Sequence, residues 1–311
     1  MEQLSFLPTT RQKSRLNRRL SALRDRVDSV GTHYSNSVAH GKLRDLSDLV
    51  PRFTRVPTQV EKMVSSERFN KRPTVAKDTL YLNRLTSGSG RIRPVCQISR
   101  GHQFISHENI VTEIEEALHT LRIDHEDVTV DVEYSAHGAK MSLVLTLPSF
   151  YDLDPVAMEP LKLQIVLHNC LSQGGLRLLA RWRQEGTGVI FPVGVSKLNA
   201  SLAHRVPARK ENILSIISKA IELASRDQQN IDNWITKRLD ATRLSNWAGN
   251  SVRRMWGNKF SSQLKLELGR GDMRVSDVLV ALSKNCVDVK DCLDQCDRIV
   301  EASVLMRSLL K

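Results

Sequence analysis

The sequence predicts an α+β protein: an antiparallel sheet of four or five strands flanked by helices, with a basic N-terminal arm and a helical C-terminal part. Three observations predict this fold. Apolar residues have helical spacing over 106–121, alternate with polar residues over 128–147 and 161–183, and return to helical spacing after residue 196. We therefore divide the chain into an arm (1–104), a core with two β-hairpins (105–240) and a helical region (241–311).

The arm starts with a basic amphipathic segment, residues 11–30. Its leucines and valines recur every three or four positions, and cations that include Arg15, Arg18 and Arg19 cover the other faces. A helix of this kind suits a neighbouring subunit, a phosphate backbone or an anionic membrane, and the lack of bulky aromatic residues on the apolar stripe disfavours the membrane. Residues 31–105 have little periodicity and several prolines, so we expect an extended, partly ordered segment.

The core begins with a helix over 106–121, for which Ser106 is a good N-cap. Strict alternation then predicts a hairpin over 128–147 that turns at Ala136-His137-Gly138. A second hairpin covers 161–183 and turns at 172–175, and Val189–Val193 adds a short strand. Helical spacing over 212–223 and 275–310 completes the pattern.

Positive charge is segregated along the chain. The 311 residues include 46 Lys and Arg against 34 Asp and Glu, a formal charge of +12. Residues 1–104 contain 20 basic and 8 acidic residues (+12), residues 105–160 contain 2 and 12 (−10), and residues 161–210 contain 8 and 1 (+7). This clustering favours contact with nucleic acid, or between an acidic face of one copy and a basic face of another, over uniformly solvated charge.

The second hairpin carries the predicted binding surface. If Leu163 and Ile165 face the core, the cations of the hairpin share the opposite face, because side chains alternate along a strand. A rigid sheet with long cations suits a phosphate backbone; the alternative is a solvated surface. The predicted nucleic-acid-binding residues of this hairpin and of the segment that follows it are Lys162, Arg177, Arg181, Arg183, Lys197, Arg205, Arg209 and Lys210, together with the three arginines of the arm. Trp182 lies on the other face, which favours a core position over a base-stacking platform.

Other chemistry has little support in the sequence. Asp131 and Glu133 lie in one strand without the partners of a nuclease metal site, so a subunit-contact surface is favoured over a Mg²⁺ site. There is no phosphate-binding loop, nucleophile elbow or HExxH motif. Cys286, Cys292 and Cys296 lack a fourth ligand, so we expect buried thiols. We expect no metal, no cofactor and no enzymatic activity.

The stretch 104–240 resembles an uncharacterised phage and plasmid-like protein family of mobile elements. The similar features are the helix before the hairpin, the segment PLKLQIVLHNCLSQGGLRLLARWR with its Asn169, and a helical tail around Asn246-Trp247. That family usually carries a Cys-Asn pair after the hairpin, where this chain has Phe191-Pro192-Val193-Gly194. The order helix, hairpin, strand, helix also resembles, in topology, the Rad52-like single-strand annealing proteins of phages, which form rings on DNA.

The expected function is therefore that of a non-enzymatic single-stranded DNA-binding protein of phage or plasmid origin, acting as a homo-oligomer, ring or filament, in strand annealing or recombination. The alternative is a structural or regulatory self-assembling protein whose basic arm contacts the acidic face of a neighbouring subunit. An enzyme is the third possibility. The lack of an apolar run of ~20 residues, of a signal peptide and of a disulfide framework predicts a cytoplasmic protein without membrane contact, in a bacterial host cell.

Overall fold

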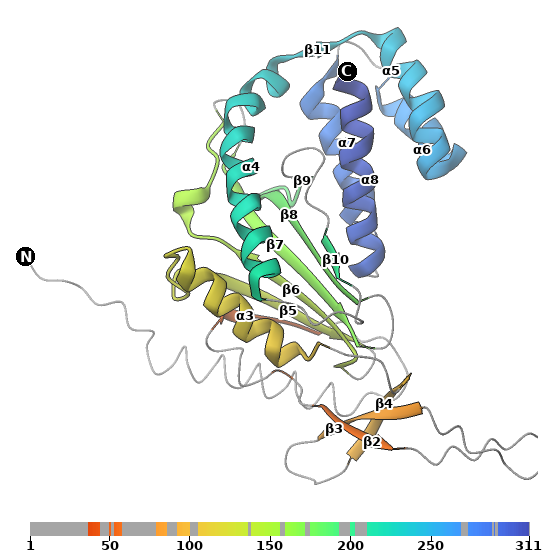
Figure 1. Ribbon diagram of the computed structural model, residues 1–311. Coiled ribbons are helices and arrows are strands. Elements are labelled where there is room, and N and C mark those ends of the chain that lie inside the picture. Colours follow the sequence, from red (N-terminus) through yellow and green to blue (C-terminus); the bar gives the residue numbers. More distant parts are fainter. Residues whose placement is uncertain are drawn as a thin grey trace, which may run out of the picture.

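Figure 1 shows the computed structural model of the chain. The structure describes residues 37–43, 50, 53–57, 79–85, 92–99, 105–135, 138–155, 159–171, 175–192, 200–202, 210–268, 273–287, 289 and 292–310. The amphipathic segment predicted over 11–30 lies outside these ranges. None of the helices within them has the length and apolar character that crossing a membrane requires.

A seven-stranded antiparallel sheet forms the centre of the fold, with the strand order β1-β5-β6-β7-β8-β10 and β9 also paired to β8. The strands are β1 (Ser37–Lys42), β5 (Thr129–Ser135), β6 (Lys140–Thr146), β7 (Leu161–Cys170), β8 (Gly175–Gln184), β9 (Ile190–Pro192) and β10 (Ala200–Leu202). Strands β5–β8 are the two predicted hairpins and β9 is the predicted fifth strand, so the α+β fold class is confirmed. The sheet is wider than predicted because β1 and β10 add to its two sides.

Strand β1 comes from the segment predicted to be an extended arm. It pairs with β5 over its whole length, from Ser37 opposite Tyr134 to Lys42 opposite Thr129. Leu43, directly after it, is completely buried. The sheet therefore crosses the boundary predicted at residue 104. Strand β1 was missed because its sequence, SVAHGK, has no alternation of apolar and polar residues; its pairing with β5 is a contact between segments far apart in sequence.

Two smaller sheets and the helices complete the described fold. Three strands from the same predicted arm form an antiparallel sheet in the order β2-β3-β4: Phe53–Pro57, Thr79–Leu85 and Ile92–Ser99. Strands β11 (Arg238–Leu239) and β12 (Met273–Arg274) pair with each other. The helices are α3 (His107–Thr120), η2 (Ser149–Tyr151), α4 (Lys210–Thr236), α5 (Ala241–Trp247), the π-helix η3 (Ala248–Val252), α6 (Arg253–Leu268), α7 (Val275–Val287) and α8 (Cys292–Leu310).

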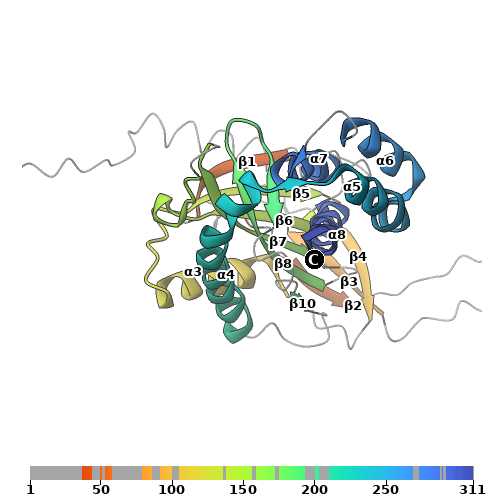
Figure 2. The same cartoon turned by 90° about the horizontal axis from the view of Figure 1, so that it is seen from above.

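Helices cover both faces of the main sheet, α3 and α4 on one side and α7 and α8 on the other (Figures 1 and 2). The α3–α4 face carries the apolar positions that alternation predicts, and Leu161, Leu163, Ile165 and Leu167 are completely buried there. Trp182 is 2% exposed on the same face, and its indole donates to the Asp227 carboxylate of α4 at 3.0 Å. The core prediction for Trp182 is therefore confirmed.

Local sequence explains how α3 is placed. The Ser106 hydroxyl accepts a hydrogen bond from the Asn109 amide at 3.1 Å, which is the predicted N-cap. His107 in the first turn is completely buried, and its Nε2 donates to the Gly138 carbonyl at 2.7 Å. The other ring nitrogen, Nδ1, accepts from the Asn169 amide at 2.9 Å. One histidine thus ties α3 to the β5–β6 turn and to β7.

Candidate nucleic-acid interface

The four sheet cations predicted to share a face do share it. In the β7–β8 register Lys162 lies opposite Arg183, Gln164 opposite Arg181 and His168 opposite Arg177. Because residues of equal parity on paired strands lie on the same side of a sheet, these side chains form one row. The row is on the face that α7 and α8 approach, away from α3 and α4.

The prediction that the whole row is exposed to bind phosphates is wrong at Arg181. This residue is 6% exposed, and its Nε donates to the Gln164 side-chain oxygen at 2.9 Å. Burial, and next the neighbouring charge of Arg183, lower the pKa of the Arg181 guanidinium to about 10. Gln164 is also buried, and its amide donates to Thr146 at 2.9 Å. The centre of the predicted surface is therefore interior.

Helices α7 and α8 cause this burial. The Ser283 hydroxyl of α7 accepts a hydrogen bond from the Ile190 amide of β9 at 2.6 Å. Asp297 of α8 accepts from Arg177 of β8. The thiols of Cys286 and Cys296, one on each helix, lie close enough to Arg181 to influence its pKa. Alternation along a strand predicts which residues share a face of the sheet. Whether that face is exposed to solvent depends on helices that come more than 90 residues later in the chain.

The outer members of the row retain partial exposure, and two of them have acidic partners. Lys162 forms an ion pair with Glu185 at 2.9 Å, and Arg177 pairs with Asp297. Arg183 is half-buried. Lys210 is the first residue of α4. The remaining predicted binding residues lie outside the described part of the chain: Lys197, Arg205, Arg209, Arg15, Arg18 and Arg19.

A second cluster of cations, which sequence reasoning missed, lies on the segment 237–268. We call this segment, which comprises β11, α5, η3 and α6, the cationic helical unit. It contains seven basic residues against two acidic ones, Asp240 and Glu267. All seven cations are exposed: Lys237, Arg238, Arg243, Arg253, Arg254, Lys259 and Lys265. The cluster was hidden in the sequence because the many carboxylates after residue 270 reduce the average charge of the C-terminal region.

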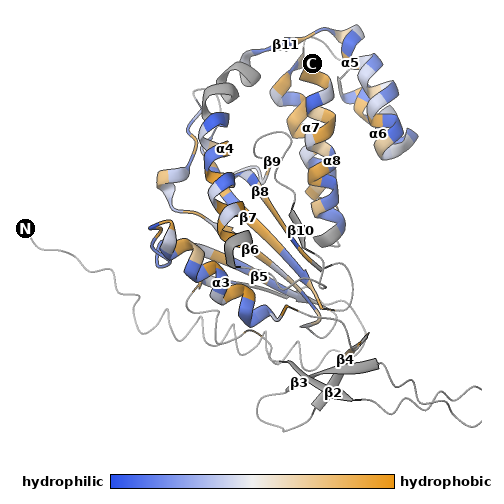
Figure 3. Ribbon diagram, viewed as in Figure 1, coloured by the Kyte–Doolittle hydropathy of each residue, from blue (hydrophilic) through white to orange (hydrophobic). Residues whose placement is uncertain are grey.

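Hydrogen bonds fix the cationic helical unit against α8. The Trp247 indole donates to the Leu305 carbonyl at 3.1 Å and to the Ser308 hydroxyl at 2.9 Å. Arg243 donates to the Leu309 carbonyl at 2.7 Å. In Figure 3 the unit shows many hydrophilic residues on α5 and α6, whereas β7 and β8 are largely hydrophobic. The exposed cations are thus carried on a packed support.

The acidic module predicted over 105–160 forms a surface of opposite sign on α3 and the loop that follows it. Residues 105–135 contain nine Asp and Glu against the single Arg122. Burial and the neighbouring Glu116 raise the pKa of Glu113, and burial raises that of Glu115. Crowded carboxylates of this kind are stabilised by an added positive charge.

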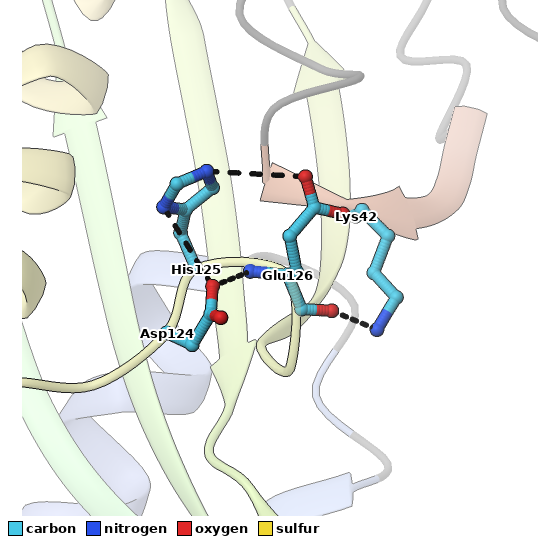
Figure 4. Close-up of polar contacts among 4 residues, drawn as sticks. All are labelled: Lys42, Asp124, His125 and Glu126. Carbon is cyan, nitrogen blue, oxygen red and sulfur yellow. Dashed lines mark hydrogen bonds and ion pairs between the residues drawn. The ribbon is translucent and has the colours of Figure 1, made fainter. Parts of the chain in front are cut away.

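In the loop between α3 and β5, Asp124 and Glu126 form contacts within the loop and with β1 (Figure 4). Asp124 accepts from the Glu126 amide at 2.9 Å, and His125 lies 4.0 Å from the Asp124 carboxylate and 3.9 Å from that of Glu126. Lys42 of β1 donates to the Glu126 carbonyl.

Within the described ranges no group of three or more His, Cys, Asp or Glu side chains is arranged to hold a metal ion. Cys170, Cys286 and Cys296 are buried, as predicted for the last two.

The protein therefore has an α+β fold in which helices cover both faces of an antiparallel sheet. Its two charged surfaces are the acidic one on α3 and the loop after it, and the basic one on the cationic helical unit. Comparison of the chain with profiles of known protein families, with curated protein sequences and with solved structures finds no match.

Proposed function

We propose that this protein binds single-stranded DNA without chemically altering it, as an oligomer that assists strand annealing or recombination of phage or plasmid DNA. The observation that carries the proposal is the set of seven exposed cations on the cationic helical unit. Lys237, Arg253, Arg254, Lys259 and Lys265 form no ion pair with any residue in the described ranges, so they are available to phosphates. The proposed substrate is found in the cytoplasm of a bacterial host, so the proposal places the protein there.

The proposed mechanism is electrostatic. Exposed cations bind the phosphate backbone and release its counterions, which gives affinity for every sequence. Aromatic residues make up only 5% of the chain, so base stacking on an aromatic platform is not the main source of affinity. The row of cations on β7 and β8 contributes less to phosphate binding than the sequence predicted, since Arg181 is buried and both Lys162 and Arg177 form ion pairs. The arginines of the arm and the cations Lys197, Arg205, Arg209 and Lys210 stay in the proposal as additional phosphate contacts.

The test is oligonucleotide binding as a function of salt. Lys237→Glu combined with Lys259→Glu should weaken binding of a fluorescent single strand for all sequences alike. The log–log salt slope should decrease by roughly 0.7 for each lost phosphate contact, about 1.4 in total. The matched control is Lys219→Glu with Lys284→Glu, which changes the same charge at exposed positions on α4 and α7. Equal losses in both double variants would show that only net charge matters, and absence of binding by the wild type would refute the proposal.

The acidic surface supports a second candidate, a self-assembling protein. The crowding of Glu113 and Glu116 on α3 favours a cationic partner, and the basic arm of a neighbouring copy has the complementary charge. Head-to-tail contacts of this kind produce rings or filaments. Light scattering at low and high salt separates the candidates: assembly that precedes and does not require DNA favours self-assembly, whereas assembly only on an added strand favours the DNA-binding proposal.

A further inference from the structure

Residues of η3, α6 and α8 line a cavity of about 1050 Å³ on the cationic helical unit. Its lining has two chemical characters. Asn250, Arg253 and Asn258 contribute polar groups, whereas Met255 and Val304 are apolar. Met255 is 37% exposed and Val304 is 41% exposed, which is unusual for side chains of their size in this structure. A cavity of this volume accommodates a small organic ligand.

The cavity is positively charged. Arg253 and Arg254 line it, and the ammonium of Lys265 lies close to Gly249, another lining residue: a Cβ added at Gly249 would be 2.8 Å from that nitrogen. The carboxylate in the lining, Glu301, already accepts from the Trp256 indole at 2.6 Å and from Arg298 at 3.3 Å. Its charge is therefore compensated from outside the cavity, and a ligand there would be anionic.

The backbone around the cavity departs from regular α-helix. The segment Ala248–Val252 forms a π-helical turn, which adds one residue to the helix beside the cavity. Gly257 within α6 has a φ of 86°, in the left-handed region that favours glycine. The Ser261 hydroxyl donates to the Ala248 carbonyl at 2.7 Å and holds α6 to the π-helical turn. π-Helical turns frequently occur at functional sites.

We infer that this cavity holds one nucleotide of a bound single strand, with its base inside against Met255 and Val304 and its phosphates on Arg253 and Arg254. The inference rests on the proposed function and names the binding site within it. A nucleotide matches the lining because it joins an anion to a flat, largely apolar ring with polar edges, for which the carboxamides of Asn250 and Asn258 provide donors and acceptors. The flexible thioether of Met255 adapts to rings of different shape, so the site tolerates any sequence.

The experiment compares two strands of equal length and charge, one normal and one with abasic positions, on the full-length protein. Because the abasic strand keeps its phosphates, the difference in Kd measures the contribution of the bases, and the comparison of cavity variants assigns that contribution to the cavity. Wild type should bind the normal strand at least about fivefold more tightly, a factor that one modest buried contact produces. Val304→Trp places a bulky side chain where the base would lie and should abolish this preference, and Leu266→Trp, at a 73% exposed position of α6 that does not line the cavity, should preserve it.

A phosphate-side variant completes the design. Arg253→Ala with Arg254→Ala should lower the salt slope by about 1.4 while normally folded by circular dichroism. If wild type binds both strands equally, or if Val304→Trp and Leu266→Trp behave alike, no base enters the cavity and the inference is overturned while the proposed function stands. If wild type binds neither strand, the proposed function itself fails.

Discussion

Arg181 and Gln164 lie opposite each other on β8 and β7, and the guanidinium Nε donates to the amide oxygen at 2.9 Å inside the protein. The partner of this buried cation is neutral. Its exposure of 6% and the lowering of its pKa to about 10 both indicate that the charged form is poorly solvated there. Arg181 nevertheless remains protonated at neutral pH. The interface between the sheet and helices α7 and α8 therefore contains a charge that costs stability.

Substitution of Arg181 should separate the effect of its charge from that of its volume. Arg181→Met removes the charge and keeps most of the side-chain volume, so its free energy of unfolding should lie within about 1 kcal/mol of wild type or above it. Both substitutions remove the donor to the Gln164 oxygen, and Arg181→Ala leaves a cavity as well, so it should lose about 2–4 kcal/mol. Urea denaturation followed by circular dichroism measures both. An equal loss in the two variants would contradict the prediction.

The thiol of Cys286 should make stability depend on pH. Burial raises its pKa from the ordinary 9.0 to about 12. Above pH 9 the unfolded thiol ionises while the folded one stays protonated, so the unfolded state binds fewer protons and unfolding becomes easier. The stabilisation is complete below pH 9 and is lost as pH rises toward about 12. Wild type should therefore lose stability relative to Cys286→Ala between pH 8.5 and 10.5, by up to about 1.4 kcal/mol per pH unit. Parallel denaturation curves of the two proteins test this, and a constant difference would refute it.

The Trp182–Asp227 hydrogen bond should hold α4 on the sheet. Both residues are buried, at 2% and 4% exposure, and the bond is 3.0 Å long. Asp227→Leu removes the acceptor of the buried indole and should cost about 1–3 kcal/mol. Asp227→Asn keeps an acceptor oxygen and should have a milder effect. Denaturation monitored by tryptophan fluorescence provides the measurement, and a leucine variant as stable as wild type would show that the bond contributes nothing.

Truncation at two positions should locate the true start of the folded core. Removal of residues 1–36 leaves β1, Leu43 and the sheet intact, so this variant should unfold with wild-type midpoint. Removal of residues 1–104 deletes a paired strand and the buried Leu43, Val50 and Ile98, and should lower stability by several kcal/mol or prevent folding. Circular dichroism and thermal melting distinguish the two. Equal stability of both truncations would restore the boundary predicted at residue 104.

The elements with strong local patterns were predictable. The Ser106 cap and the apolar stripe after it predicted α3, and alternation over β5–β8 predicted both hairpins together with the burial of Leu163, Ile165 and Trp182. These predictions succeeded because hydrophobic periodicity is a property of neighbouring residues. The prediction that Lys162, Arg177, Arg181 and Arg183 share one face of the sheet was correct for the same reason. The cationic helical unit was missed, because charge was averaged over a region that also contains the carboxylates of α7 and α8.

Local residue patterns and composition were therefore enough to predict the fold class, the apolar face of the sheet, the shared face of the sheet cations and the segregation of charge. Packing between distant segments was needed to establish that Arg181 is buried, that β1 belongs to the main sheet, and that Arg253 and Arg254 line a cavity with Met255 and Val304. The physical reason is the range of the interactions. Periodicity assigns each residue to a side of its own element, whereas exposure depends on which distant element packs against that side, as α8 does through Asp297 and Arg177, separated by 120 residues in the chain.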